Sequence, residues 1–376
     1  MDALLLLSGD AQNFVAKIWA SHVHLHHDDA AGLVALLSLD DVDRLLTSTA
    51  LRTPALRMAK DGKVLPASSF TRSASLAGQP LAGLVDPRKV LDLVDTGASV
   101  VLQGLHRYWP PLTDLVRSLE MALGHPCQAN AYLTPPGSQG FAVHSDTHDV
   151  FVFQTHGRKQ WEVHDGSGAA RHVLLEPGVV MYLPAGTPHA ARAQEAASLH
   201  VTVGINQVTW RSLLTEVAED LLQSPQYDGR LPAGYLQDPT ALTAGVRERL
   251  QNLAGALADQ DPTVVASGTS HRFLSRRTSV LRGAVADRLQ LSALHDDSVL
   301  SRRESTPCVL VPQGDRLRIL LGDRELVVPA RLADPMRFVA AQRTLRPADL
   351  AEWLDLDSRA VLARRLVREG LLRIGT

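Results

Sequence analysis

The chain has 376 residues, of which 38 are basic and 40 acidic, so its formal net charge is −2. Hydrophobic residues make up 45% of it, which is enough for packed cores and excludes a disordered chain. The near-neutral charge excludes a protein whose whole surface is a basic trap for nucleic acid. The two cysteines cannot build a disulfide framework or a cysteine zinc site. No segment reads as a signal peptide or membrane span, so we expect a cytoplasmic protein without a membrane partner.

Short helical and strand patterns alternate in the first part of the chain. Phe14, Ile18 and Trp19 fall on one face of a short helix. The leucines of residues 33–46, together with Val42, recur mostly at helical spacing. The alternating histidines of residues 22–27 predict a partly exposed strand, although such a strand can also bind adventitious metal. The dipeptide at residues 61–62, Asp-Gly, predicts a turn between two strand-like pieces.

The pattern changes between residue 130 and about residue 208. Runs rich in β-branched and aromatic residues at 150–153, 161–164, 179–183 and 199–205 alternate with Gly/Pro turns. Short strands at this spacing predict an antiparallel barrel or sandwich. From Trp210 to about residue 290 the apolar residues have helical spacing, and from about residue 307 two short strands precede two helices. The sequence therefore predicts three regions.

The strongest chemical signal is the tripeptide His144-Ser-Asp146, followed 43 residues after Asp146 by His189. Residues i and i+2 of a strand point to one face, so we expect His144 and Asp146 to point together into a barrel. His189 follows a turn framed by glycine and prolines that can bring it opposite them. Two histidines and one carboxylate are the ligand set of non-haem Fe(II) oxygenases, which leaves three positions open. Zinc is the alternative metal, because it also binds His and Asp.

Lys159 lies on a following strand, fifteen residues after His144. An ammonium group that faces into a barrel beside a metal needs an anionic partner, because an unpaired buried charge is costly. The distal carboxylate of 2-oxoglutarate would be that partner. The alternative is a solvated lysine at a strand end.

Four other histidines flank this motif. His148 is a candidate substrate contact at the mouth of the site. His156 is expected at a turn and His164 at a strand end, both on the surface. His200 either lines the pocket or packs against its neighbours.

The segment NAYLTPPGSQGFAVHSD, from Asn130 to Asp146, and the following FVFQ and GRKQW resemble the JmjC-type ribosomal oxygenases. These are cupin-fold Fe(II)/2-oxoglutarate hydroxylases that act on histidyl or arginyl residues of ribosomal proteins. The match is dense over about residues 130–205. The resemblance implies an iron ligand set and a co-substrate site: His144, Asp146 and His189 as ligands, Lys159 as the partner of 2-oxoglutarate, and Asn130, Tyr132 and the weaker candidate Thr202 in the same pocket.

The resemblance also implies an α+β fold with three domains. A double-stranded β-helix (cupin/JmjC) barrel would occupy residues 1–208, a helical dimerisation domain 209–290 and a winged-helix domain 291–376, so a homodimer is expected. The last helix carries arginines that would suit DNA binding, but nearby acidic residues nearly cancel their charge. We therefore expect the winged helix to bind protein, and we do not expect a nucleic-acid partner.

These observations predict an Fe(II)-, 2-oxoglutarate- and dioxygen-dependent oxygenase that hydroxylates a side chain of a protein or peptide. The YLTPPGSQGFA segment is closest to the histidyl hydroxylases, which favours histidine at its β-carbon. Ser145, Thr147 and His148 stand where relatives often have acidic or aromatic residues. For that reason two substrates stay open, a ribosomal protein and the precursor of a ribosomally made peptide natural product, with an arginyl hydroxylase third. From another class, the chain could be a non-catalytic, ligand-sensing cupin regulator.

Overall fold

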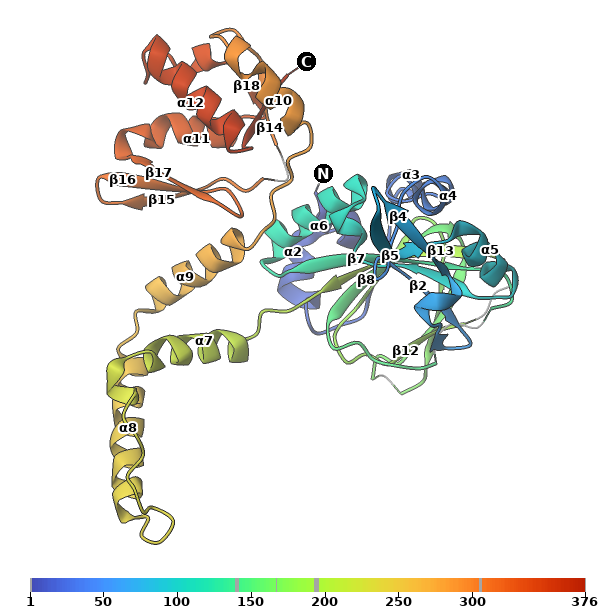
Figure 1. Ribbon diagram of the computed structural model, residues 1–376, viewed down its shortest axis with the longest axis horizontal. Helices are drawn as coiled ribbons and strands as arrows, with labels where there is room; N and C mark the ends of the chain where they lie inside the picture. The colour runs from blue at the N-terminus through green and yellow to red at the C-terminus, as the bar shows by residue number, and fades with distance from the viewer. Residues whose placement is uncertain (1, 139–141, 167, 193–195, 304–305, 376) are drawn as a thin grey trace. The chain divides into compact units, whose positions relative to one another are not determined.

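The structure is a computed structural model that describes residues 2–138, 142–166, 168–192, 196–303 and 306–375 (Figure 1). The chain splits into two compact units, Met1–Gln207 and Val208–Thr376. We call the first the barrel unit and the second the C-terminal unit. The predicted boundary at about residue 290 stays a prediction. None of the described helices has both the length and the apolar character needed to cross a membrane.

The helices of the barrel unit lie mostly before its long strands. Its α-helices are α1 (Ala3–Ser8), α2 (Ala11–Asn13), α3 (Ala30–Val34), α4 (Leu39–Thr47), α5 (Pro87–Asp95) and α6 (Pro110–Leu123), and a π-helical turn covers Phe14–Ile18. Local chemistry explains the ends of several. Ser38 and Asp41 form a capping box at the start of α4, and α6 begins at Pro110 and ends before Gly124, which has a left-handed φ of 70°.

The strands of the barrel unit form two facing sheets and a separate hairpin. The larger sheet has the order β1-β11-β8-β13-β7-β6-β2-β3, the smaller β10-β9-β12, and β4 pairs with β5. The strands are β1 (His24–His27), β2 (Leu56–Lys60), β3 (Lys63–Val64), β4 (Thr71–Leu76), β5 (Gln79–Val85), β6 (Ser99–Leu102), β7 (Cys127–Thr134), β8 (Asp149–Gly157), β9 (Lys159–Val163), β10 (Arg171–Leu175), β11 (Val179–Leu183), β12 (His189–Arg192) and β13 (Ser198–Ile205). All pairings within these sheets are antiparallel.

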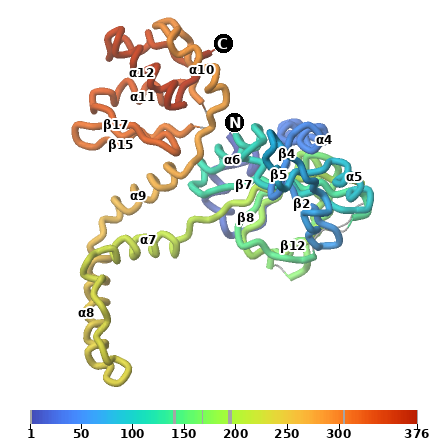
Figure 2. Tube along the Cα trace, viewed as in Figure 1, coloured from blue at the N-terminus to red at the C-terminus, as the bar shows by residue number. Residues whose placement is uncertain are grey.

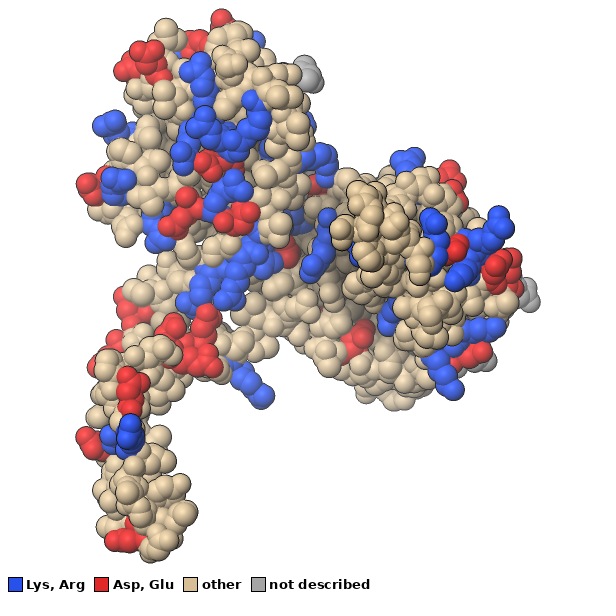
Figure 3. Space-filling view, in the orientation of Figure 1, with Lys and Arg blue, Asp and Glu red and all other residues tan. Residues whose placement is uncertain are grey.

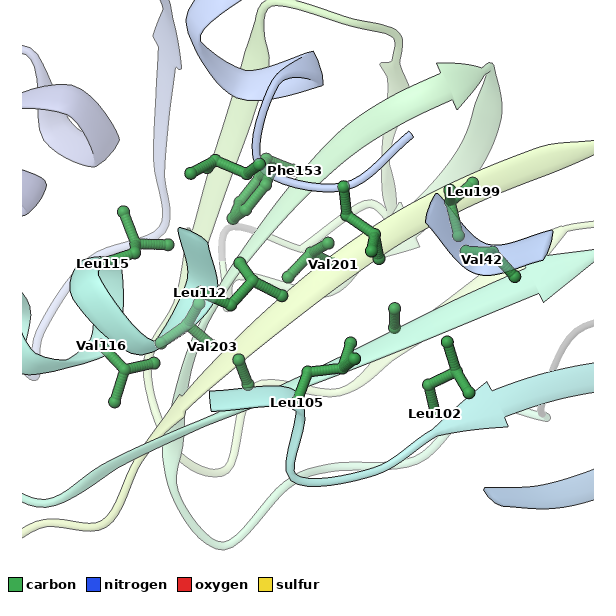
Figure 4. Close-up of a cluster of buried hydrophobic side chains, with 14 of the residues drawn as sticks. Val42, Leu102, Leu105, Leu112, Leu115, Val116, Phe153, Leu199, Val201 and Val203 are labelled. Atoms are coloured by element: carbon green, nitrogen blue, oxygen red, sulfur yellow. The ribbon is translucent and has the colours of Figure 1, made fainter. Parts of the chain in front are cut away.

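Strand alternation divides the large sheet into a core face and a barrel face. On β8, Phe151 and Phe153 join the cluster that packs against α6, whereas Val150 and Val152 face the small sheet and contact the cluster around Trp161. Figure 4 shows the first cluster, in which residues of α6 meet those of β8 and β13. Because the period of a strand is two, every second residue of β7, β8 and β13 is delivered into the barrel.

Most predicted strands are present. The runs at 150–153, 161–164, 179–183 and 199–205 fall in or overlap β8, β9, β11 and β13, and the Asp-Gly turn joins β2 to β3. The histidine-rich segment forms the partly exposed strand β1. The expected position of His156 was wrong: it lies within β8 and not at a turn, because this strand continues to Gly157, whose φ of 63° ends it.

The C-terminal unit begins with three helices, α7 (Trp210–Leu222), α8 (Thr240–Ala258) and α9 (Pro262–Ser275) (Figure 2). No residue of α7 or α8 is buried, and Trp210 is 80% exposed. Leu214 and Leu250 are exposed as well, so these helices present apolar side chains that the chain itself does not cover. The far end of the α8 segment is mostly uncharged on the face seen in Figure 3.

The remainder of this unit has its own core. Its helices are α10 (Ala284–Gln290), α11 (Ala333–Ala341) and α12 (Leu356–Arg368), and its strands β14 (Leu300–Arg302), β15 (Val309–Gln313), β16 (Arg316–Leu320), β17 (Glu325–Pro329), β18 (Thr344–Leu345) and β19 (Leu372–Ile374). Two three-stranded sheets result, β18-β14-β19 and β15-β16-β17. Leu300, Met336 and Leu366 lie in one buried cluster. Arg359 on α12 donates two hydrogen bonds of 2.6 Å to Asp296, so this arginine has a carboxylate partner within the unit.

Candidate metal centre

A cavity of about 400 Å³ lies inside the barrel. Its wall follows from strand alternation, because residues of β7 and β13 that do not enter the core face line it. From β7 these are Gln128, Asn130, Tyr132 and Thr134, and from β13 they are His200, Thr202 and Gly204. The cavity is thus built mainly from long strands held in a packed sheet, which fixes its wall residues.

His144, Asp146 and His189 meet in this cavity. One ligand atom from each lies within 4.8 Å of the others, and His189 Nε2 is 3.7 Å from Asp146 Oδ2. Each histidine places Nδ1 2.9 Å from the carbonyl oxygen two residues earlier, Ala142 for His144 and Thr187 for His189. A neutral imidazole that donates Nδ1–H to a carbonyl keeps the lone pair of Nε2 for a metal.

The backbone brings these residues together differently from the expected strand. His144 and His189 form a single isolated bridge, with hydrogen bonds of 3.0 and 2.8 Å between their amides and carbonyls. The pairing does not extend into a ladder, and on its other side the Pro188 carbonyl accepts a hydrogen bond of 2.9 Å from the His164 amide. The Gly186 amide instead donates to the carbonyl of Asp146 at 2.8 Å. The two motif halves are thus tied to each other through backbone groups.

A buried carboxylate supports the turn that leads to His189. Asp149 is fully buried and accepts hydrogen bonds from the Tyr182 hydroxyl at 2.6 Å and the Ala185 amide at 2.7 Å, as well as from the Gln207 side chain. Burial raises the pKa of Tyr182, so this phenol stays protonated and donates. Asp149 therefore joins the end of β11, the following turn and the end of β13.

Lys159 is buried in the same cavity and is not the solvated strand-end lysine weighed as an alternative. Lys159 is 4% exposed, and its Nζ donates a hydrogen bond of 2.9 Å to Thr134 Oγ1. Burial lowers the pKa of Lys159 to about 8. Asp146 is the only carboxylate among the described residues that line the cavity. Among the described residues the ammonium group is thus hydrogen-bonded to a hydroxyl and forms no ion pair with a carboxylate.

The other predicted pocket residues also lie in the wall. Asn130 Oδ1 accepts a hydrogen bond of 2.9 Å from the Gly104 amide, which orients the side-chain amide. Tyr132 stacks on His200, with ring centroids 4.9 Å apart and planes at 5°, and its hydroxyl is hydrogen-bonded by Thr202. His200 both lines the cavity and packs, since it is 3% exposed and burial lowers its pKa well below the usual value.

The remaining histidines divide as expected between cavity and surface. His148 lines the cavity and lies over Gly204, where a Cβ would come within 2.6 Å of its Nε2. His156 is exposed. His164 is not part of the cavity lining, and its Nε2 lies 2.9 Å from Glu162 Oε1. Three residues of the segment from Asn130 to Asp146, at positions 139, 140 and 141, lie outside the described residues.

Several wall residues were not found by sequence reasoning. Arg57 and Gln128 carry no motif, and Thr134 and Trp161 were quoted only as neighbours of motif residues. Strand alternation from Asn130 points to Gln128 and Thr134. For Arg57 no signal exists in the sequence, because its place depends on pairing of β2 with β6 and of β6 with β7.

Comparisons with known proteins agree with this geometry. Residues 109–213 match the family model of the JmjC domain. The bifunctional lysine-specific demethylase and histidyl-hydroxylase of Branchiostoma floridae is 36% identical over 162 residues, 41% of this chain and 26% of that protein. Human ribosomal oxygenase 1 is 25% identical over 321 residues, 78% of this chain and 47% of that protein. The solved structure of the Escherichia coli ribosomal oxygenase YcfD with cobalt and 2-oxoglutarate has a TM-score of 0.54 at 19% identity, and covers 97% of this chain and 98% of that one.

The barrel and the matched segment define an α+β protein with a cupin-fold JmjC domain. Within that class, the chain is similar to the ribosomal oxygenases, among them ribosomal oxygenase 1 of Danio rerio, which is 29% identical over 203 residues. It spans from about a quarter to about half of the length of the curated relatives named above. The likeness to the solved structures concerns the fold.

Proposed function

We propose that this protein is an Fe(II)- and 2-oxoglutarate-dependent oxygenase that hydroxylates a side chain of a protein or peptide. The observation that carries the proposal is that His144, Asp146 and His189 meet in one cavity. Lys159 is buried in the same cavity and forms no ion pair with a described carboxylate. Two imidazoles that offer Nε2 and one carboxylate suit Fe(II) and leave room for further ligands. The donor set therefore fits the metal.

Lys159 fits the co-substrate. Among the described residues its ammonium group is hydrogen-bonded to the Thr134 hydroxyl and forms no ion pair with a carboxylate. The distal carboxylate of 2-oxoglutarate would neutralise it, with the Thr134 hydroxyl as a second donor. Asn130, Tyr132 and Thr202 line the same space and would orient the co-substrate or substrate. The YcfD structure with cobalt and 2-oxoglutarate supports this assignment by analogy of fold.

The bound iron and 2-oxoglutarate would supply oxidation by dioxygen, with one oxygen atom placed in a substrate C–H bond and the other in succinate as carbon dioxide is released. The protein contributes orientation and a dry wall. Val150, Val152 and Trp161 give the barrel face its apolar part, which keeps water away from the reacting atoms. His144 and His189 are held by their Nδ1 hydrogen bonds, so the ligand geometry is set before the metal binds.

For the substrate we propose histidyl hydroxylation at the β-carbon. The name of the Branchiostoma relative, a histidyl-hydroxylase, supports this choice. A ribosomal protein is the first substrate setting, because several relatives are called ribosomal oxygenases. A precursor of a ribosomally made peptide natural product is the second, because Ser145, Thr147 and His148 depart from the residues often found in relatives. Arginyl hydroxylation is the third.

The substrate proposal is tested by mass spectrometry of ribosomal proteins from the native host with and without the gene. A gene-dependent gain of one oxygen atom on a single histidine is the expected result. A gain on an arginine would replace histidyl by arginyl hydroxylation. If no ribosomal protein changes, the ribosomal setting is wrong, and peptides encoded beside the gene are examined by the same method.

We also propose the finer division of the chain and its assembly. The exposed apolar residues of α7 and α8 support a helical dimerisation domain over residues 209–290 and hence a homodimer. The helices α10 to α12 with the sheet β18-β14-β19 support a winged-helix domain over 291–376. The pairing of Arg359 with Asp296 favours protein over nucleic acid as its partner. Light scattering of the purified protein tests the dimer, and a monomer would contradict it. The cytoplasm is the proposed location.

A further inference from the structure

Arg57 stands in the wall of the cavity because of its strand register. On β2 it pairs with Val101 of β6, and Val101 pairs with Tyr132 of β7. Leu56 and Met58, its neighbours along β2, enter the core on the other face. Arg57, Val101 and Tyr132 therefore form a row across three strands on the barrel face, and both Arg57 and Tyr132 line the cavity.

The guanidinium group of Arg57 is only partly satisfied. It hydrogen-bonds to the hydroxyl of Tyr132. That hydroxyl lies close enough to Asp146 for the carboxylate to help raise the pKa of Tyr132, after the larger effect of burial. The Nε atom of Arg57 is buried and has no hydrogen-bond partner among the residues that the structure describes. A buried donor without a partner is costly, and a guanidinium group is built to bind two acceptor atoms at once. Arg57 is thus a donor beside the candidate metal centre with hydrogen-bonding capacity to spare.

The other charged residues of the cavity have roles that leave the Arg57 guanidinium group available to bind the substrate. Arg57 and Lys159 are the arginine and the lysine of the described wall, and Asp146 is its only carboxylate. If Asp146 binds the metal and Lys159 binds 2-oxoglutarate, neither is available to Arg57. The missing partner of Arg57 must then arrive with the molecule that is hydroxylated.

The rim of the cavity next to Arg57, formed by the turn between β2 and β3, is also positively charged. Gly62, in the turn between β2 and β3, lines the cavity. Lys60 and Lys63 flank this turn, and Asp61 is the one acid between them. The hairpin therefore adds a net positive charge at the wall that carries Arg57, which attracts acceptors and carboxylates and repels cations.

We infer that Arg57 determines specificity: it binds an acceptor or carboxylate of the substrate, so that the cavity takes an uncharged or acidic side chain and rejects a guanidinium or ammonium group. The inference rests on the proposed function and narrows it, because it excludes arginyl hydroxylation. A cationic side chain in this cavity would face Arg57 without a counter-ion, and like charges brought together at low dielectric repel strongly.

The test uses the 376-residue chain loaded with Fe(II) and 2-oxoglutarate. It is offered a randomised peptide library, and mass spectrometry locates each added oxygen atom. Wild type is compared with Arg57→Glu, which reverses the charge, and Arg57→Gln, which keeps a hydrogen-bonding side chain of similar shape. Arg72→Glu on the exposed part of β4 makes the same change of charge outside the cavity and is the matched control. Co(II) absorption bands and thermal melting confirm an intact site in each variant.

Wild type and Arg72→Glu are expected to oxygenate uncharged or acidic residues, and Arg57→Glu to shift the product ratio toward arginine and lysine by about tenfold or more. Arg57→Gln should lie between them. Oxygen placed mainly on arginine or lysine by wild type would overturn the inference alone, as would an unchanged ratio in Arg57→Glu. Absence of both peptide oxygenation and 2-oxoglutarate consumption would remove the proposed function itself, and the inference with it.

Discussion

Replacing Lys159 with methionine is expected to stabilise the ligand-free protein while it abolishes 2-oxoglutarate binding. The ammonium group is buried, and within the described part of the chain the Thr134 hydroxyl is its one hydrogen-bond partner. Burial lowers its pKa from 10.5 to about 8. At about 1.4 kcal/mol per pH unit, holding this charge at pH 7 costs the folded state about 3 kcal/mol.

Methionine removes that cost but also one hydrogen bond, which contributes about 1 kcal/mol. Thr134 keeps a contact of 3.3 Å with the Ser99 hydroxyl. A net gain of about 2 kcal/mol corresponds to a rise in Tm of about 4–8 °C for a unit of this size. Between pH 8 and 10.5 the unfolded chain binds more protons at Lys159 than the folded one, so wild-type stability rises with pH. The advantage of the variant should therefore shrink as pH rises from 7 to 10.

The assay is thermal melting without metal, at several pH values, with and without added 2-oxoglutarate and Co(II). Lys17→Met removes the same charge from an exposed position of the same unit and is the control, with little expected change. With ligands present, wild type should gain stability and Lys159→Met should not. A variant that is less stable than wild type at every pH, or that still responds to 2-oxoglutarate, would refute the reasoning.

Three further outcomes are expected. Asp149→Asn removes one of the carboxylate oxygens that accept from the Tyr182 hydroxyl and the Ala185 amide. The free energy of unfolding in urea should therefore fall by about 3 kcal/mol, and Co(II) binding should weaken. An unchanged urea midpoint would contradict this. Gly204→Ala places a Cβ 2.6 Å from His148 Nε2, so peptide hydroxylation should fall while Co(II) affinity stays the same; equal loss of both would argue against a role of His148 at the substrate. The affinity of the protein for 2-oxoglutarate, measured by titration of the Co(II) form, should fall above about pH 8 as Lys159 loses its proton, and a flat profile from pH 7 to 9.5 would be inconsistent with that ion pair.

The candidate metal-binding set, which the structure brings together, could be proposed from the sequence because its chemistry is restrictive. Few residue types bind Fe(II), and His144 and Asp146 at i and i+2 with a turn-borne His189 leave a visible pattern. The expected strand around His144 is in fact a single bridge between His144 and His189. Pattern and chemistry together were enough to gather the ligands, although the backbone that holds them was not foreseen.

The rest of the cavity depends on pairings that the sequence does not reveal. Arg57 reaches the site through β2, β6 and β7, whose paired residues lie far apart along the chain. His200 could not be assigned to lining or packing from sequence, because a residue stacked on Tyr132 inside a barrel does both. The strands from β8 to β13 were predictable because their β-branched runs are long enough to stand out, unlike the three residues of β14.

The most direct test of the central claim is Fe(II)-dependent succinate formation from 2-oxoglutarate by the purified protein, measured for wild type and Asp146→Ala, with Co(II) binding followed in parallel. We expect wild type to form succinate and bind Co(II), and Asp146→Ala to lose both while it remains folded. Succinate formation that persists in Asp146→Ala, or a folded wild type that binds metal but consumes no 2-oxoglutarate with any peptide or ribosomal protein, would contradict the assignment of this site as an oxygenase centre.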